Sequence, residues 1–280
     1  MDYIYGLLDV ILPVDWLQFD FMKNAFLAVL LITPLFGLLS TMVVSNRMAF
    51  FSDSLGHGAF TGLAIGAIVG FFSPVESLVL FSVFFALVIT LIKNYTSAST
   101  DTVIGVFSST GIAIGLMIMS YGGGFNKFSG YLIGDILSIT PDDIAALLIV
   151  LVSVVVVWGL MFNKLLILSL NSPFAKSRGG NVIITESIFA VMVAVVVAIS
   201  IQWVGLLIIN SLLVLPAAAA RNISNSVKQY HLFSVGSAML AGISGLILAY
   251  RYNMAAGATI VVIAALIFFV TMILKSRFVR

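Results

Sequence analysis

Long apolar runs recur along this chain, and they constrain its fold more than any other feature. A run of about 20 mostly apolar residues can cross a bilayer as an α-helix. The sequence predicts such spans near residues 25–45, 54–72, 75–93, 102–121, 142–162, 182–201, 204–220, 231–250 and 256–274. The count falls from nine to eight if the two runs beside Gln202 form one broken helix.

Composition supports an all-α, polytopic integral membrane bundle. Charged residues make up 9% of the 280 residues, whereas a soluble domain has about 25%. We therefore expect one transmembrane domain over residues 1–280, with no length left for a sizeable soluble domain. The net charge of +2 is scattered among loops, which argues against a nucleic-acid partner. The absence of cysteine excludes disulfides and thiolate metal sites.

Short segments between the runs add detail to this bundle. Ser73-Pro74 predicts a tight hairpin between two antiparallel helices. The apolar piece Tyr131–Ile139 is too short to cross, so we expect it to re-enter or cap the bundle as a short helix. The acidic N-terminus is the reverse of a secretory signal. It carries Asp2, Asp9, Asp15 and Asp20.

Basic residues gather on one side of the predicted topology. The positive-inside rule therefore places the N-terminus outside and the C-terminus inside. The inner group comprises Arg47, Lys93, Lys164, Lys176, Arg178, Arg221, Lys228, Lys275, Arg277 and Arg280, and the outer exceptions are Lys127 and Arg251. One inner loop is long, Asn163–Asn181, and it suits a short amphipathic interfacial helix. It is either a surface loop without a partner or a docking element for a soluble subunit.

Asp53 and His57 are the main candidates for function. Their spacing puts both side chains on one face of a helix. Counting from Arg47 at about 1.5 Å per residue places His57 roughly 15 Å deep, near the middle of a ~30 Å hydrocarbon core. Ionisable groups at that depth are costly and therefore point to function. Imidazole with carboxylate suits Zn²⁺, Mn²⁺ or Fe²⁺. On spacing alone, a helix cap at Asp53 and a packed imidazole at His57 explain the pair equally well.

Glycines recur every fourth residue after this pair, at Gly58, Gly62, Gly66 and Gly70. Overlapping GxxxG motifs let neighbouring helix backbones approach closely. This face lies about 100° around the helix from the Asp53/His57 face. The sequence therefore predicts a helix that packs tightly on one side and presents its polar pair on another.

Other polar residues have weaker claims. Asp135 could cap the short outer piece or lie at the mouth of a conduit. We expect Asp142 and Asp143 to be first-turn acids that complement a helix dipole, Glu186 to cap a helix start, and His231 to be interfacial.

The span near 204–220 holds further polar residues. We expect interhelical hydrogen bonds from Gln202, Asn210 and Ser211, although these side chains could also line a polar path.

Missing motifs narrow the function further. The sequence has no GxxxxGK[ST] P-loop, no catalytic-triad motif and no HExxH. We therefore predict no catalytic residues and no stably bound cofactor. Few charges lie in the spans, which leaves a proton- or sodium-coupled mechanism little to work with. Energy for transport would come from a partner.

Four motifs, in order, resemble the membrane permeases of bacterial ABC importers for zinc, manganese and iron. Residues 47–57, RMAFFSDSLGH, resemble that family's R-x-[AS]-[YF]-x-x-D-x-x-x-H pattern. Residues 101–105, DTVIG, are similar to its D-T-x-[IL]-G helix start. Residues 130–143, GYLIGDILSITPDD, are close to its YLFGDILAVTPxDL, and 204–221, VGLLIINSLLVLPAAAAR, look like its VGxLLxxSLLIIPAATAR. The likeness runs over nearly the whole chain. It departs from the family pattern at Gly56, where small apolar residues are usual, and at Ile133, where Phe is usual.

The resemblance implies a homodimeric, multi-pass permease of the bacterial cytoplasmic membrane, with a translocation path along the dimer interface. An ATPase subunit would dock at the cytoplasmic coupling loop, Asn163–Asn181, and an extracytoplasmic metal-binding protein would deliver the ion. The family's metal-path aspartate and histidine map onto Asp53 and His57.

The motifs leave the ion open. The stretches around Asp135 and Pro216 look more like zinc permeases, whereas Ser52-Asp53 looks more like the manganese/iron branch. Zinc is favoured, with a manganese/iron importer as the alternative. Two alternatives come from other classes of protein: a stand-alone secondary cation transporter without an ATPase, and a membrane scaffold in which the polar pair only satisfies helix packing.

Overall fold

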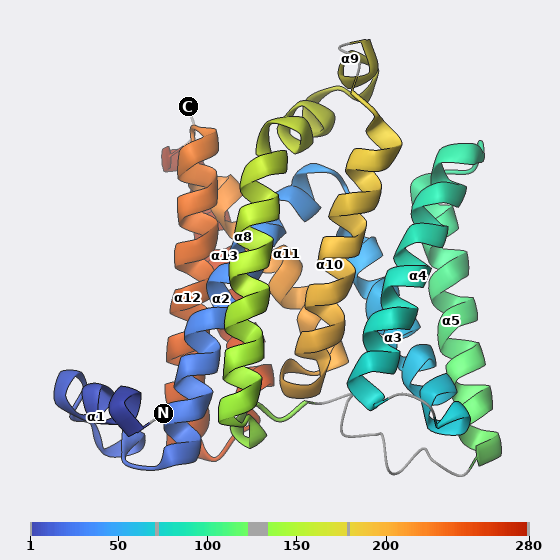
Figure 1. The fold of residues 1–280 in the computed structure, drawn as a ribbon. Coiled ribbons are helices and arrows are strands. Elements are labelled where there is room, and N and C mark those ends of the chain that lie inside the picture. The colour runs from blue at the N-terminus through green and yellow to red at the C-terminus, as the bar shows by residue number, and fades with distance from the viewer. Residues whose placement is uncertain (1, 71–72, 123–133, 178–179, 279–280) are drawn as a thin grey trace. The chain divides into compact units, whose positions relative to one another are not determined.

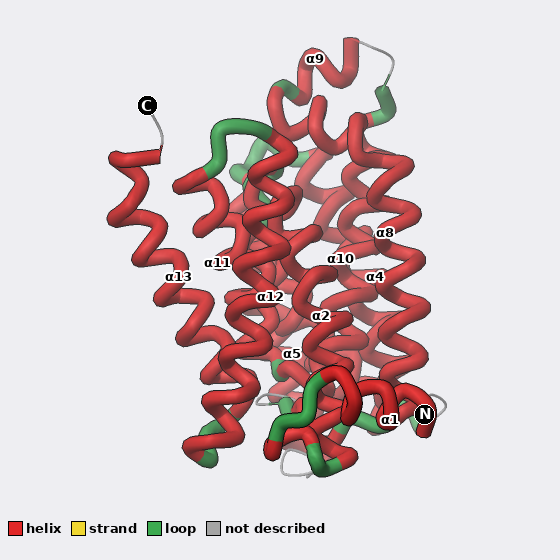
Figure 2. Tube along the Cα trace, turned by 90° about the vertical axis from the view of Figure 1, so that its left-hand side faces the viewer, coloured by secondary structure: helices red, strands yellow, loops and turns green. Residues whose placement is uncertain are grey.

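The structure is a computed structural model that describes residues 2–70, 73–122, 134–177 and 180–278, and in these ranges its regular elements are all helical. Lys127 and residues 131–133 lie outside this description. The elements are α1 (Asp2–Ile11), η1 (Asp15–Leu17), α2 (Asp20–Ser45), α3 (Ala49–Val69), α4 (Pro74–Tyr95), α5 (Thr100–Gly122), η2 (Ile136–Ser138), α8 (Pro141–Leu170), α9 (Ser172–Ser177), α10 (Val182–Val204), α11 (Leu206–Ile223), α12 (Val227–Tyr252) and α13 (Ala256–Phe278) (Figures 1 and 2).

Within the described residues, seven helices are long and apolar enough to cross a membrane, namely α2, α4, α5, α8, α10, α12 and α13. Two further helices, α3 and α11, correspond to the remaining predicted spans. The polytopic helical fold is thereby confirmed. The chain breaks between α10 and α11 at Gly205, whose φ of 87° is a conformation that favours glycine.

Two predicted boundaries were wrong. Helix α3 begins at Ala49, five residues before the predicted span. The prediction started too late because Ser52, Asp53 and His57 lower the hydropathy of the first turns. Helix α8 continues to Leu170, so the first part of the predicted inner loop is helical. In the described part of the short outer piece, only the three-residue turn η2 is helical.

Local capping explains where several helices start. Ser73 and Glu76 form a reciprocal capping box before Pro74, which confirms the predicted hairpin. Thr140 and Asp143 pair in the same way, with the Thr140 amide donating to Asp143 Oδ2 at 2.9 Å. The Asp135 side chain accepts from the Leu137 amide at 3.0 Å, so it caps η2.

The helices fall into two compact units. The first contains Met1–Thr41, Gly134–Val155 and Ser211–Arg280. In it, Ser40 Oγ accepts from the Ala217 amide at 3.1 Å and Ser234 Oγ donates to the Gly37 carbonyl at 2.6 Å.

The second unit contains Met42–Ile133 and Val156–Asn210. In this unit, α4 packs against both α3 and α10, and α3 also packs against α5. Asp53 and His57 therefore belong to the same unit as the predicted coupling segment. A single domain over residues 1–280 stays a prediction.

Candidate functional site

Asp53 and His57 lie in the first three turns of α3 and face each other. His57 Nε2 is 3.6 Å from Asp53 Oδ2, which is too long for a good hydrogen bond. The side chains are 22% and 39% exposed, respectively. The predicted shared face is confirmed, and the two groups are near neighbours.

The other ring nitrogen of His57 is unusual. Nδ1 is buried and has no hydrogen-bond partner among the described residues. Buried polar atoms are nearly always paired, so an orphan calls for an explanation. A neutral imidazole has one nitrogen that can accept a proton or bind a metal. Within the described ranges, a hydrogen bond from a packed histidine is therefore not seen at Nδ1, and the role of the pair in a metal path stays a prediction.

Close packing fixes the orientation of α3. A Cβ added at Gly62 would lie 2.5 Å from Phe81 Cβ and 2.9 Å from the Ser77 carbonyl oxygen, both in α4. On the α5 side, Thr61 Oγ1 donates to the Gly111 carbonyl. The predicted tight face is confirmed at Gly58, Gly62 and Gly66, which α4 covers, whereas Gly70 has no atom of the described residues within 4 Å of an added Cβ.

A hydrogen bond joins α3 to the start of α11 beside Asp53. Ser52 Oγ donates to Asn210 Oδ1 at 2.8 Å. This confirms the predicted interhelical role of Asn210. It also holds a carboxamide next to the first turn of α3, one residue away from the candidate carboxylate.

In the described ranges, no three His, Cys, Asp or Glu side chains come close enough together to hold a metal ion. Asp53 and His57 are therefore a pair without a third His, Cys, Asp or Glu beside them in the described part of the chain. Asp135 caps η2, Asp143 pairs with Thr140 at the start of α8, and His231 Nδ1 is 2.8 Å from the Val227 carbonyl oxygen in the first turn of α12.

Glu186 was predicted to be a helix cap, and that prediction was wrong. Its Oε2 lies 3.0 Å from Lys93 Nζ and accepts from Asn94 Nδ2 at 2.8 Å. The side chains of Lys93 and Glu186 are only 18% and 15% exposed. The pair thus ties the end of α4 to the start of α10. The sequence indicated that the two residues could meet, since Lys93 and Glu186 both lie at the predicted inner ends of their membrane spans.

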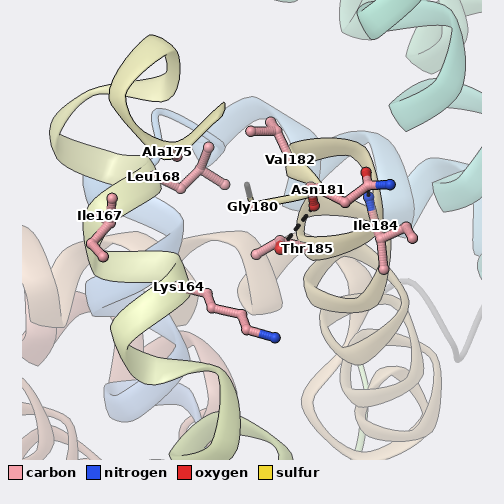
Figure 3. A pocket seen from close by; sticks show the side chains of 9 residues that line it. All are labelled: Lys164, Ile167, Leu168, Ala175, Gly180, Asn181, Val182, Ile184 and Thr185. Atoms are coloured by element: carbon pink, nitrogen blue, oxygen red, sulfur yellow. Dashed lines mark hydrogen bonds between the residues drawn. The ribbon is translucent and has the colours of Figure 1, made fainter. Parts of the chain in front are cut away.

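The predicted coupling segment borders a cavity of about 530 Å³ (Figure 3). The end of α8, the α9 region and the start of α10 form its walls. Asn181 caps α10 by accepting from the Ile184 amide at 3.1 Å, and Thr185 Oγ1 donates to the Asn181 carbonyl at 3.1 Å. The cavity is lined by Lys164, Ile167, Leu168, Ala175, Gly180, Asn181, Val182, Ile184 and Thr185.

Comparison with known proteins gives consistent results. The ABC 3 transport family matches residues 18–275. The high-affinity zinc uptake system membrane protein ZnuB of Buchnera aphidicola (subsp. Baizongia pistaciae) is 31% identical, covering 89% of this chain and 96% of that protein. The manganese import system permease protein ScaB of Streptococcus parasanguinis is 29% identical, covering 93% and 92%. The solved PsaBC from Streptococcus pneumoniae in complex with Fab matches with a TM-score of 0.80 at 26% identity, covering 97% of this chain and 95% of that one.

Proposed function

The chain belongs to the ABC 3 transport family, and on that basis we propose that it is the membrane permease of an ATP-driven importer of divalent metal ions. A separate subunit hydrolyses ATP. The observation that carries the proposal is the Asp53/His57 pair, with His57 Nδ1 buried and unpartnered in the described structure. A carboxylate and an imidazole on one helix face form a mixed oxygen and nitrogen ligand set for a borderline cation.

Zn²⁺ is the favoured substrate. An unconstrained site with these ligands binds Zn²⁺ more tightly than Mn²⁺ or Fe²⁺. The relatives named for zinc and for manganese are similar in identity, so selectivity between these ions is expected to depend on the protein that delivers them. In this proposal Asp53 and His57 act as transient ligands along the path.

Two copies of the chain form the path. One copy offers two ligands in its described residues, and a second copy would double that number. The ATPase docks at the segment that contains α9, next to the cavity between α8 and α10. The metal-binding protein docks at the opposite, outer side of the membrane.

Reconstitution tests this function. We expect proteoliposomes that contain the chain, its ATPase and the binding protein to accumulate ⁶⁵Zn²⁺ only when ATP is present. Vesicles with the chain alone are the control. Zinc flux through the chain alone, at the rate of the full complex, would instead identify a stand-alone cation transporter.

A further inference from the structure

Helix α1 is outside the seven apolar spans, and one of its faces is both apolar and exposed. At about 100° per residue, positions 3, 4, 7, 10 and 11 share an arc of about 120°. Tyr3 is 85% exposed and Val10 is 82% exposed. We call this surface the α1 apolar face, and it consists of Tyr3, Ile4, Leu7, Val10 and Ile11.

The opposite side of α1 is bound to the first turns of α2. Asp9 Oδ2 is 2.8 Å from Lys23 Nζ. The Tyr5 hydroxyl donates to Asn24 Oδ1, and the Lys23 ammonium lies 5.5 Å from the centre of the Tyr5 ring. Lys23 is buried, so Asp9 supplies the counter-charge for a cation that water does not reach. Helix α1 is therefore held against the start of α2 (Figures 1 and 2), and its apolar face is exposed.

The attachment point sets the depth of α1. The 26 residues of α2 extend about 39 Å, roughly 9 Å more than a ~30 Å hydrocarbon core. If the excess is shared between the two ends, the core begins about 4.5 Å along the helix, at the level of Lys23. Tyr3, Tyr5 and Trp16 lie at this end of the chain, and Tyr and Trp are the residues that gather at the membrane–water boundary.

From these three features we propose that α1 is an interfacial helix whose apolar face is immersed in the bilayer. It would lie in the plane between headgroups and acyl chains, about 5–10 Å into that boundary. Lipid fits this face better than a protein partner because α1 is attached to α2 at the level where the hydrocarbon core begins. The face carries no charge, and its one polar side-chain group is the Tyr3 hydroxyl, which suits an interfacial position. The acids near it, among them Asp9 and Asp15, favour a zwitterionic surface. This inference does not depend on which ion the protein carries.

Spin labels can measure the depth, since the chain has no cysteine. Tyr3→Cys and Val10→Cys would be labelled in the full chain in phosphatidylcholine vesicles. Leu160→Cys, on a residue that is 78% exposed in the span α8, is the lipid control. Lys176→Cys, on exposed α9, is the aqueous control.

We expect labels at positions 3 and 10 to collide with oxygen several-fold more, relative to a nickel chelate, than the label at position 176. The ratio should approach that at position 160. A ratio equal to that at position 176 would place the face in water, and low collision with both reagents would mean that protein covers it. Either result overturns the proposal. Adding Asp9→Asn should increase the mobility of the label at position 10, and unchanged mobility would contradict the tethered orientation.

Discussion

Replacing Glu186 with Gln tests the ion pair that joins α4 to α10. The Gln side chain keeps the shape of Glu and can still accept from Asn94, but it removes the negative charge. Lys93 would then lose a partner 3.0 Å away while its side chain remains 18% exposed.

The expected cost follows from burial. At 3.0 Å and an effective dielectric constant of about 20, the Coulomb attraction is about 5–6 kcal/mol before desolvation is subtracted. Removing one partner of a fully buried pair costs about 3–5 kcal/mol, and an exposed pair contributes about 0–1 kcal/mol. For side chains that are about one-sixth exposed, we expect a loss of about 2–3 kcal/mol. That corresponds to a decrease in Tm of about 4–12 °C for a chain of this size.

Thermal unfolding of the purified protein in detergent, followed by circular dichroism, measures this decrease. Glu76→Gln is the matched control because it makes the same change in the exposed capping box of α4. The double variant Lys93→Met/Glu186→Leu should recover most of the loss, since neither charge is left unpaired. If Glu186→Gln unfolds at the same temperature as Glu76→Gln, the pair does not stabilise the α4–α10 contact. The same conclusion follows if the double variant loses as much stability as the single variants Lys93→Met and Glu186→Leu do together.

Two further sets of substitutions test how α3 is held. Gly62→Ala puts a methyl group 2.5 Å from Phe81 Cβ and should destabilise the protein by about 1–3 kcal/mol. The control Gly159→Ala, with no atom within 4 Å of the new Cβ, should stabilise it by about 0.5–1 kcal/mol. Equal Tm shifts would refute the close α3–α4 approach. Ser52→Ala and Asn210→Ala remove the two ends of one hydrogen bond. A double-mutant cycle, with free energies of unfolding derived from the Tm values, should give a coupling energy of about 0.5–1.5 kcal/mol. A coupling energy of zero would mean that the bond does not hold α11 to α3.

Much of the fold followed from local properties of the sequence. Apolar runs located the spans because lipid-exposed backbone must be helical. Ser73 and Asp143 marked helix starts because capping depends on residues three positions apart. The Asp53/His57 proximity was predictable for the same reason, since the i, i+4 spacing alone brings the two side chains together.

Other features depend on which helices are neighbours, and periodicity does not carry that information. The Lys93–Glu186 pair joins residues from two helices far apart in the chain, so Glu186 looked like a local cap. The start of α3 was placed too late because its polar residues resemble a loop when hydropathy alone is considered. The unpartnered Nδ1 of His57 likewise depends on how α3 packs against its neighbours.

Metal uptake by Asp53 and His57 variants tests the central claim most directly. The full complex, reconstituted with Asp53→Asn or His57→Ala, should take up ⁶⁵Zn²⁺ at least about tenfold more slowly, because even partners outside the ligand set typically cost 10–100-fold in metal affinity. His231→Ala, which changes the only other histidine, should leave uptake near the parental rate. If both Asp53→Asn and His57→Ala fold normally and transport at the parental rate, the pair is structural and the ion takes another route.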